Sequence, residues 1–177
     1  MKIEKSSDLI KIDDLVHLYS DCFSKGLSEQ YVDLNALTLY LKSFFEKGAI
    51  ISIFDQNKLV GALLAIPIGF DEFFPEKLKT AFEGKNVWYI AEMMIEEKLR
   101  GQGWGQKLLN EFFSDAKHFN ISDVFIRVWD KNIAALTLYR NTGFVDIAEI
   151  EQTKRKADLS GIFIMKKIYL HKKIQNV

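Results

Sequence analysis

The chain has 177 residues, a length typical of one domain with a single sizeable hydrophobic core. Apolar residues make up 48% of it, including 14 phenylalanines, which argues against a disordered chain. Acidic and basic residues balance at 24 each, so the overall charge gives no attraction toward nucleic acid or an anionic membrane. We expect one globular domain spanning residues 1–177.

The few cysteine and histidine residues indicate a chain without disulfides or a metal site. Cys22 is the only cysteine, and His17, His118 and His171 are too far apart in sequence to have the spacing of metal ligands. The N-terminus lacks an apolar signal core, and no apolar run approaches the roughly 20 residues of a membrane helix. We expect a soluble, cytoplasmic protein that binds no metal, nucleic acid or membrane.

Two amphipathic helices are expected before the first long strand. Residues 8–23 place apolar side chains on one helical stripe, and residues 6–8, two serines and an aspartate, can supply the N-cap. After a polar stretch, Asp33 can cap a second helix, whose apolar positions continue to Gly48.

A β-hairpin and an irregular segment come next. Residues 49–54 and 59–66 are apolar and β-branched, and residues 55–58 between them form turns readily. Pro67 should fall at the end or edge of the second strand, because proline has no N–H group to donate. Residues 69–86 are irregular, with room for one helical turn.

The second half of the chain alternates strands and helices. We predict strands at 87–95, 124–129, 144–150 and 161–170, and helices at 104–119 and 133–142, the last one stopped by Gly143. Two helices, an antiparallel hairpin and this alternation imply an α/β fold of the mixed α+β kind. Such a fold has a mixed sheet with helices on both faces.

One glycine-rich stretch carries the strongest functional signal. It runs Arg100-Gly-Gln-Gly-Trp-Gly-Gln between the predicted strand 87–95 and the predicted helix 104–119. Glycine permits positive φ and close backbone approach, so consecutive N–H groups can converge on an anion. The positive end of the following helix points to the same place. The stretch therefore predicts a diphosphate site.

Other phosphate-binding loops fit this spacing poorly. A dinucleotide fingerprint needs G-x-G-x-x-G, whereas Gln106 stands where its third glycine would be. A P-loop needs Gly-Lys-Ser/Thr, whereas Gly105 is followed by Gln106-Lys107-Leu108. A glycine turn that only fits a tight connection remains an alternative at this point.

The glycine-rich stretch and a later block resemble one known family. Arg100-x-x-Gly103-x-Gly105 resembles the R/Q-x-x-G-x-G/A motif of the GCN5-related N-acetyltransferase (GNAT) family. A second block similar to that family follows at the expected separation and contains Asn132, Leu138-Tyr139 and Gly143-Phe144. The resemblance covers nearly the whole chain and implies a GNAT-like twisted sheet of about seven strands, mostly antiparallel and splayed at the centre.

The resemblance also implies a cosubstrate, acetyl-CoA, and the residues that hold it. Amides of the loop 99–105 would hold the CoA diphosphate, and the strand 93–95 would pair with the pantetheine arm in the splayed gap. Asn132 would contact CoA, and Tyr139 would lie near the thioester sulfur. The predicted contacts are Met93, Met94, Ile95, Arg100, Gly101, Gln102, Gly103, Trp104, Gly105, Gln106, Asn132, Ala135 and Tyr139.

Two residues are predicted to take part in acetyl transfer. The departing thiolate benefits from a proton donor, and Tyr139 suits that role unless it only packs on the core. Glu92, just before Met93, is placed to take a proton from an amine, directly or through a water. Burial would raise its pKa toward the useful range. The alternative for Glu92 is a sheet-face glutamate paired with a neighbouring cation.

Several other residues have two interpretations. Arg100 either contacts phosphate or anchors the loop by bonding nearby carbonyl groups. We interpret Trp104 as a packing residue at the helix start and Cys22 as a buried structural thiol. The basic residues Lys166, Lys167, Lys172 and Lys173 are interpreted as a solvated strand end rather than a nucleic-acid contact.

The residues give less information about the acceptor. Segment 69–86 is longer than the turn usual in the family, and its Asp71 and Glu72 could attract a cationic amine toward Glu92. The blander interpretation is a surface loop with its phenylalanines packed on the core. Residues 24–31 and 149–158 are further candidate acceptor loops.

The resemblance implies an acyl-CoA-dependent N-acetyltransferase. It would act on a primary amine of a small molecule, peptide or protein, by direct attack in a ternary complex. We expect it to be a monomer or a homodimer. The alternative is a non-catalytic module that senses acyl-CoA or serves as a scaffold.

Overall fold

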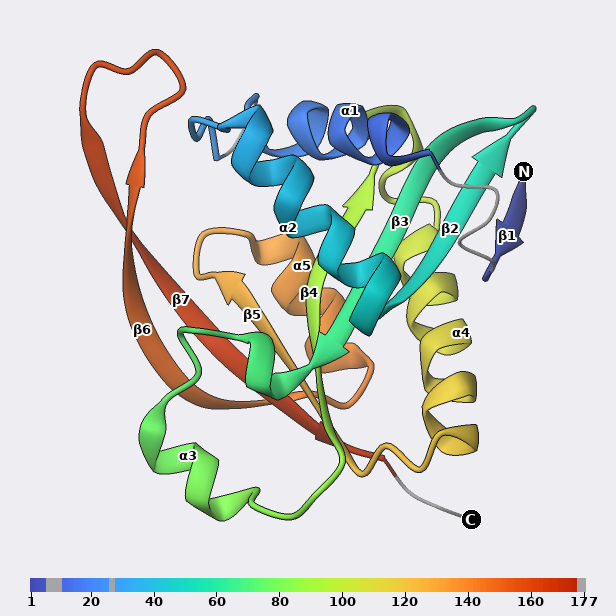
Figure 1. Ribbon diagram of the computed structural model, residues 1–177, viewed down its shortest axis with the longest axis vertical. Helices are drawn as coiled ribbons and strands as arrows, with labels where there is room; N and C mark the ends of the chain where they lie inside the picture. Colours follow the sequence, from blue (N-terminus) through green and yellow to red (C-terminus); the bar gives the residue numbers. More distant parts are fainter. Residues whose placement is uncertain (6–10, 26–27, 175–177) are drawn as a thin grey trace.

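Seven strands form one mixed sheet in the computed structural model, which describes residues 1–5, 11–25 and 28–174 (Figure 1). The strands are β1 (Lys2–Glu4), β2 (Ala49–Asp55), β3 (Lys58–Pro67), β4 (Val87–Ile95), β5 (Asp123–Trp129), β6 (Val145–Arg155) and β7 (Ile162–Lys173). Their order is β1-β2-β3-β4-β5-β7-β6, and every neighbouring pair is antiparallel except β4 and β5. The predicted mixed, mostly antiparallel sheet is therefore confirmed. The short edge strand β1 was not predicted.

Helices cover both faces of the sheet, as predicted. They are α1 (Ile12–Phe23), α2 (Leu34–Lys47), α3 (Glu76–Ala81), α4 (Trp104–His118) and α5 (Ile133–Asn141). Phe44 of α2 lies in a buried cluster with Tyr169 of β7, whereas Phe112 of α4 lies in a second cluster with Ile168. Because successive strand residues point to opposite faces, α1 and α2 cover one face and α4 and α5 the other.

The two N-terminal helices differ in how well the sequence predicts their starts. α1 begins at Ile12 rather than at residue 8, and Lys11 at its N-cap makes no side-chain cap bond. The N-caps predicted at residues 6–8 lie outside the described residues. α2 begins as predicted, because the Asp33 carboxylate accepts hydrogen bonds from two first-turn N–H groups at 2.9 and 3.0 Å. Gly48 follows its last residue.

The predicted hairpin is formed by β2 and β3. Gln56 and Asn57 between them have φ values of 47° and 69°, the left-handed pair of a tight type I′ turn. Pro67 is the last residue of β3, as expected for a residue without an N–H group.

The C-terminal hairpin is longer than predicted. β6 continues to Arg155 and β7 to Lys173, and Figure 1 shows the hairpin extending beyond the other strands. Residues 149–155 are therefore strand rather than the predicted loop, and their contribution to an acceptor site stays a prediction. Both faces of β6 carry polar side chains, so the apolar alternation that marks a half-buried strand is absent there.

The segment between β3 and β4 is anchored to the sheet. It contains a 3-10 helix, η2 (Ile68–Phe70), and the predicted helical turn, α3. Asp71 is buried, and its carboxylate accepts hydrogen bonds from the Arg127 guanidinium at 2.9 Å and the Tyr169 hydroxyl at 2.7 Å. Phe74 packs edge-on against Phe125 at 4.9 Å between ring centres. Asp71 is thus an anchor rather than a binding group for an amine, and only the exposed Glu72 stays free for that role.

Candidate active site

The centre of the sheet is splayed between its two parallel strands. β4 and β5 pair from Val87 with Asp123 to Ile90 with Ile126, and no further. Residues 91–95 of β4 and 127–129 of β5 therefore diverge. The predicted splay is confirmed, and it leaves one edge of β4 without a neighbouring strand.

Backbone alternation decides which groups of β4 face this gap. The N–H of Glu96 donates to the Val60 carbonyl on β3 at 2.9 Å. In an antiparallel pair every second residue bonds the partner, so Met94 also directs its N–H and C=O to β3. Met93 and Ile95 direct theirs into the gap. Of the three predicted strand contacts, the backbone of Met94 is thus occupied by β3.

A β-bulge in β4 puts Glu92 on the face covered by α1 and α2. The register shifts there, since Leu64 pairs with Glu92 whereas Ala65 pairs with Ile90, leaving Ala91 as the extra residue. Directly paired residues share a face, and Leu64 lies in the cluster beneath α1 and α2. The side chain of Met93 lies on the opposite face, against the cluster of α4 and α5.

The glycine loop presents a row of free N–H groups. Gly101 and Gly103 have φ values of 73° and 80°, and a Cβ atom at either would meet nothing within 4 Å. The backbone N–H groups of residues 101–106 have no hydrogen-bond acceptor among the described residues. These N–H groups lie in the loop before α4 and in its first turn, so the positive end of the helix dipole adds to them. Such a row of free amides has the geometry that an anion site requires, and binding of a diphosphate there stays a prediction.

Gly105 has a different purpose from the other two glycines. A Cβ atom there would lie 2.8 Å from the Leu138 side chain of α5 and 3.4 Å from the Met93 sulfur. Gly105 therefore lets the start of α4 approach α5 and β4 closely. Its substitution would disturb packing before it touched a ligand.

The polar side chains of the loop bond within the protein. Arg100 Nε donates to the Ile95 carbonyl at 3.0 Å, which favours the anchoring interpretation. Gln102 donates to the Lys98 carbonyl at 2.8 Å, and Gln106 donates to Asn110 at 3.0 Å. Trp104 packs against the core, as interpreted from the sequence.

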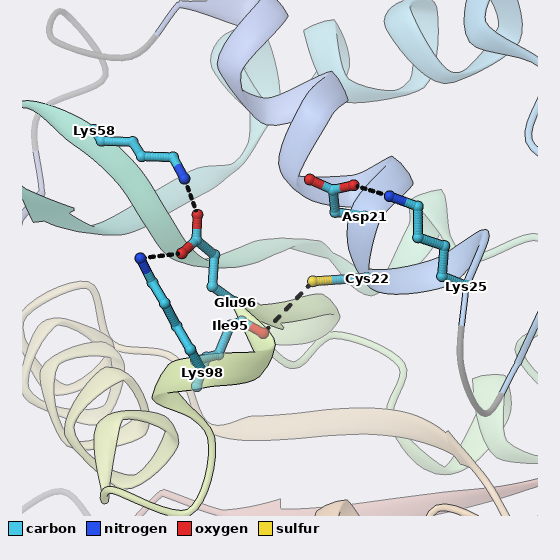
Figure 2. Close-up of polar contacts among 7 residues, drawn as sticks. All are labelled: Asp21, Cys22, Lys25, Lys58, Ile95, Glu96 and Lys98. Carbon is cyan, nitrogen blue, oxygen red and sulfur yellow. Dashed lines mark hydrogen bonds and ion pairs between the residues drawn. The ribbon is translucent and has the colours of Figure 1, made fainter.

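Side-chain contacts also fix the end of β4 just before the loop. Figure 2 shows the Cys22 thiol directed at the Ile95 carbonyl, with 3.7 Å between sulfur and oxygen. It also shows Glu96 between Lys58 and Lys98. Burial alone would raise the pKa of Glu96, but hydrogen bonds from the two lysines hold it below its ordinary value. The loop therefore starts from a fixed strand end.

The second motif places Tyr139 beside Met93. Tyr139 is 5% exposed, and its hydroxyl contacts the Met93 sulfur at 3.9 Å. Burial raises the pKa of Tyr139 well above its usual range, and the negative charge of Glu92 raises it further. A thioether is a weak acceptor, so this hydroxyl has no strong partner within the described chain.

Asn132 is the N-cap of α5. Its side-chain oxygen accepts the N–H of Ala135 at 3.2 Å, so these two predicted cofactor contacts bond each other. Direct contact of either residue with CoA stays a prediction.

Glu92 is held by a tyrosine that the sequence did not reveal. The Tyr40 hydroxyl of α2 donates to Glu92 Oε1 at 2.9 Å. Burial raises the pKa of Glu92, while this hydrogen bond and the charges of Lys167 and Lys154 oppose the increase. Glu92 has no cation within ion-pair distance among the described residues. The alternative of a glutamate in a sheet-face ion pair is therefore not what the structure shows.

Within the described ranges, no three His, Cys, Asp or Glu side chains come together as a metal site would require. None of the described helices has the length and apolar character needed to cross a membrane.

Several solved structures with the same fold are described as acetyltransferases. The ribosomal-protein-alanine N-acetyltransferase of Brucella melitensis matches with a TM-score of 0.71 at 19% identity, covering 98% of this chain and 99% of that one. The yncA structure from Salmonella typhimurium, described with its cofactor acetyl-CoA, matches with a TM-score of 0.71 at 15% identity, covering 99% and 94%. An N-acetyltransferase of Staphylococcus aureus reaches 0.72 at 11% identity, covering 98% of each chain.

The sequence itself matches a family model. Residues 12–144, more than half of the 177-residue chain, match the description "Acetyltransferase (GNAT) family". That span contains β4, the glycine loop, α4 and α5, which form the site described above. The chain therefore belongs to the acetyltransferase (GNAT) family.

Proposed function

We propose that this protein is an N-acetyltransferase that moves the acetyl group of acetyl-CoA to a primary amine by direct attack in a ternary complex. The observation that carries this proposal is the unpaired edge of β4. Free amides of the glycine loop adjoin it, and Glu92 and Tyr139 lie on the two opposite faces of the sheet beside it. An acyl donor and an amine can thus approach the gap from different sides.

The residues present fit the phosphate and amide groups of acetyl-CoA. Amides of residues 101–106 would hold the diphosphate, and the gap-facing N–H and C=O of Met93, with the N–H of Ile95, would pair with the pantetheine amides, because the Ile95 carbonyl already accepts from Arg100 and Cys22. When bound, acetyl-CoA supplies an activated thioester carbonyl. The Met93 N–H is placed to stabilise negative charge on that carbonyl oxygen.

Glu92 and Tyr139 would move the two protons of the reaction. Glu92 Oε1 is held by Tyr40, which leaves Oε2 to accept the proton of the attacking amine. The Tyr139 hydroxyl then donates its proton to the thiolate that leaves when the carbon–sulfur bond breaks. The new bond joins the amine nitrogen to the acetyl carbon, so charges and protons balance.

Direct attack is favoured over an acetylated enzyme because the nearby thiol is a poor nucleophile. Burial raises the pKa of Cys22, although the charge of Arg100 opposes the increase. Its sulfur also donates to the Ile95 carbonyl at 3.7 Å.

Thermal stabilisation by acetyl-CoA tests the cofactor assignment. Gly103 and Gly84 offer a matched pair, since both have positive φ, 80° and 73°, and open space at the Cβ position. Alanine at either costs roughly 1–2 kcal/mol of stability, because L-residues disfavour this conformation. We expect acetyl-CoA to raise the Tm of the wild type and of Gly84→Ala, and to do so much less in Gly103→Ala.

The activity itself is tested by thiol release from acetyl-CoA with panels of amines. Equal stabilisation by NAD, with no response to CoA, would disprove the cofactor assignment. Stabilisation by acetyl-CoA without thiol release for any amine would instead identify a non-catalytic acyl-CoA-binding module.

A further inference from the structure

Three cationic side chains share the face of the sheet on which Glu92 lies. Arg127 of β5 pairs with Tyr169 of β7, whose ring lies in the cluster beneath α1 and α2. Lys167 is two residues before Tyr169 and therefore faces the same way. Ile150 pairs with Lys167, so Lys154, four residues further along β6, faces this side too.

Among the described residues, Arg127 is the only one of these three cations with a counter-ion. Arg127 forms an ion pair with Asp71 at 2.9 Å, and its guanidinium lies over the Phe73 ring at 4.9 Å. Lys154 and Lys167 have no carboxylate within ion-pair distance among the described residues, although both are partly buried. Their neighbour Lys166, on the opposite face of β7, is paired with Glu149. The interpretation of Lys167 as a solvated strand end is therefore corrected.

Both lysines have a lowered pKa. Burial, together with the positive charges of Lys154 and Arg127, lowers the pKa of Lys167 to about 8, while Glu92 and Asp71 oppose the decrease. Burial likewise lowers the pKa of Lys154. Two partly buried ammonium groups without a paired carboxylate destabilise the free protein. An anion that joined them would remove that destabilisation.

Two polar atoms on the same elements also lack a partner. Gln152, between Ile150 and Lys154 on this face of β6, is 6% exposed, and its side-chain oxygen has no hydrogen bond within the described residues. The Nε of Arg127 is likewise buried and unpartnered there. Buried polar groups in native proteins normally have a hydrogen-bond partner, so these two atoms are available to bond a water molecule or a ligand.

From this arrangement we infer that the acceptor is a small amine that also carries a carboxylate or phosphate group. Lys154 and Lys167 would bind the anionic group while the amine lies at Glu92. This inference rests on the proposed function and names the class of acceptor. It modifies the expectation that Asp71 and Glu72 help to attract a cationic amine toward Glu92, since Asp71 is bonded to Arg127 and Tyr169 within the protein.

A small acceptor is favoured because the outer end of this face is closed by the chain. The N–H of Tyr31 donates to the Arg155 carbonyl, and the N–H of Ala157 donates to the Glu29 carbonyl, each at 2.8 Å. These bonds join the segment before α2 to the end of the β6–β7 hairpin, next to Lys154 (Figure 1). An extended polypeptide lying past Lys154 would have to displace them.

Matched pairs of amines test the inference. Thiol release from acetyl-CoA is measured with L-amino acids and their carboxamides, and with O-phosphoethanolamine and ethanolamine. Loss of a charge-assisted contact should lower kcat/KM roughly ten- to a hundredfold for the uncharged member of the preferred pair. The two kinds of pair also separate a carboxylate site from a phosphate site.

Lysine variants connect this preference to the residues. Lys167→Met and Lys154→Met should raise KM for the anionic amine about tenfold or more and leave KM for its uncharged counterpart unchanged. Lys173→Met, an exposed position of the same strand, is the matched control and should change neither.

Several outcomes would overturn the inference while the proposed function stands. Carboxamides or polyamines that are better substrates than every anionic amine would do so, as would peptides that exceed all small amines. An equal decrease of kcat for both members of a pair in Lys167→Met would make Lys167 a proton acceptor instead.

If no amine is acetylated although acetyl-CoA binds, the proposed function fails and the anion site is judged by binding alone. The same pairs are then compared by thermal shift in the presence of CoA. Stabilisation by the anionic members only would support the site, and equal or absent stabilisation would reject it.

Discussion

The two sides of β4 are built from different parts of the chain. On the side of α4 and α5, the proposed diphosphate site consists of consecutive backbone groups of residues 101–106. On the side of α1 and α2, the proposed acceptor site consists of side chains from one helix and four strands, namely Tyr40, Glu92, Arg127, Lys154 and Lys167. A site made of contiguous backbone leaves a motif in the sequence. A site made of distant side chains becomes visible only when the strand order is known.

Replacing the proposed base on the acceptor side should lower kcat more than any other substitution considered below. Glu92→Gln keeps the shape of the side chain but removes proton acceptance, so kcat should fall roughly a hundred- to ten-thousandfold. Burial raises the pKa of Glu92, so the wild-type rate should decline on acidification above the pH at which an ordinary glutamate protonates. This decline, the acidic limb of the pH profile of kcat/KM, should be absent from the Glu92→Gln variant.

Glu83→Gln, at an exposed position outside both sites, is the control for this variant. The Kd for acetyl-CoA should be unchanged in both, since the donor side does not use Glu92. A Glu92→Gln enzyme with normal kcat and a normal acidic limb would contradict the assignment of the base.

Tyr139→Phe should have the next largest effect, on the donor side. Without a proton for the leaving thiolate, kcat should decrease roughly ten- to a thousandfold with little change in acetyl-CoA affinity. The hydroxyl contacts only a thioether sulfur, so Tm should hardly change. Thermal melts and steady-state kinetics are measured on the same preparation of the variant. If Tyr139 only packs on the core, kcat of Tyr139→Phe should equal that of the wild type under conditions in which the chemical step limits the rate.

Tyr40→Phe should have the smallest effect and sharpens the account of the acceptor side. The Tyr40 hydrogen bond stabilises the ionised form of Glu92 and so lowers its pKa. Its removal should raise that pKa and shift the acidic limb of kcat/KM to higher pH, with only a few-fold loss at alkaline pH. An unmoved limb would mean that Glu92 does not set it.

Local patterns predicted the fold best where one face is apolar and the ends carry clear signals. The boundaries of β4 were predicted correctly because Val87–Ile95 is an apolar run between turn residues. The start of α2 followed from the capping of Asp33. The far half of β6, residues 151–155, was missed because it pairs only with β7 and carries polar residues such as Lys154 on its inner face.

The site was predictable to the extent that it depends on local conformation. Positive φ at Gly101 and Gly103 follows from the motif, whereas the packing of Gly105 against Leu138 depends on how two helices meet. The burial of Asp71 was equally hidden, because its partners Arg127 and Tyr169 are far away in the chain. Only tertiary structure distinguishes such an anchor from a binding group.

The place of β7 between β5 and β6 has a consequence for biosynthesis. The ribosome makes β7 after every other strand, yet β7 separates β5 from β6 in the finished sheet. Until residues 162–173 have left the ribosome, β5 has an edge without a neighbouring strand. Such an unpaired edge is a template on which a strand of another chain can pair. The edge of β5 is therefore exposed to aggregation during synthesis until β7 docks.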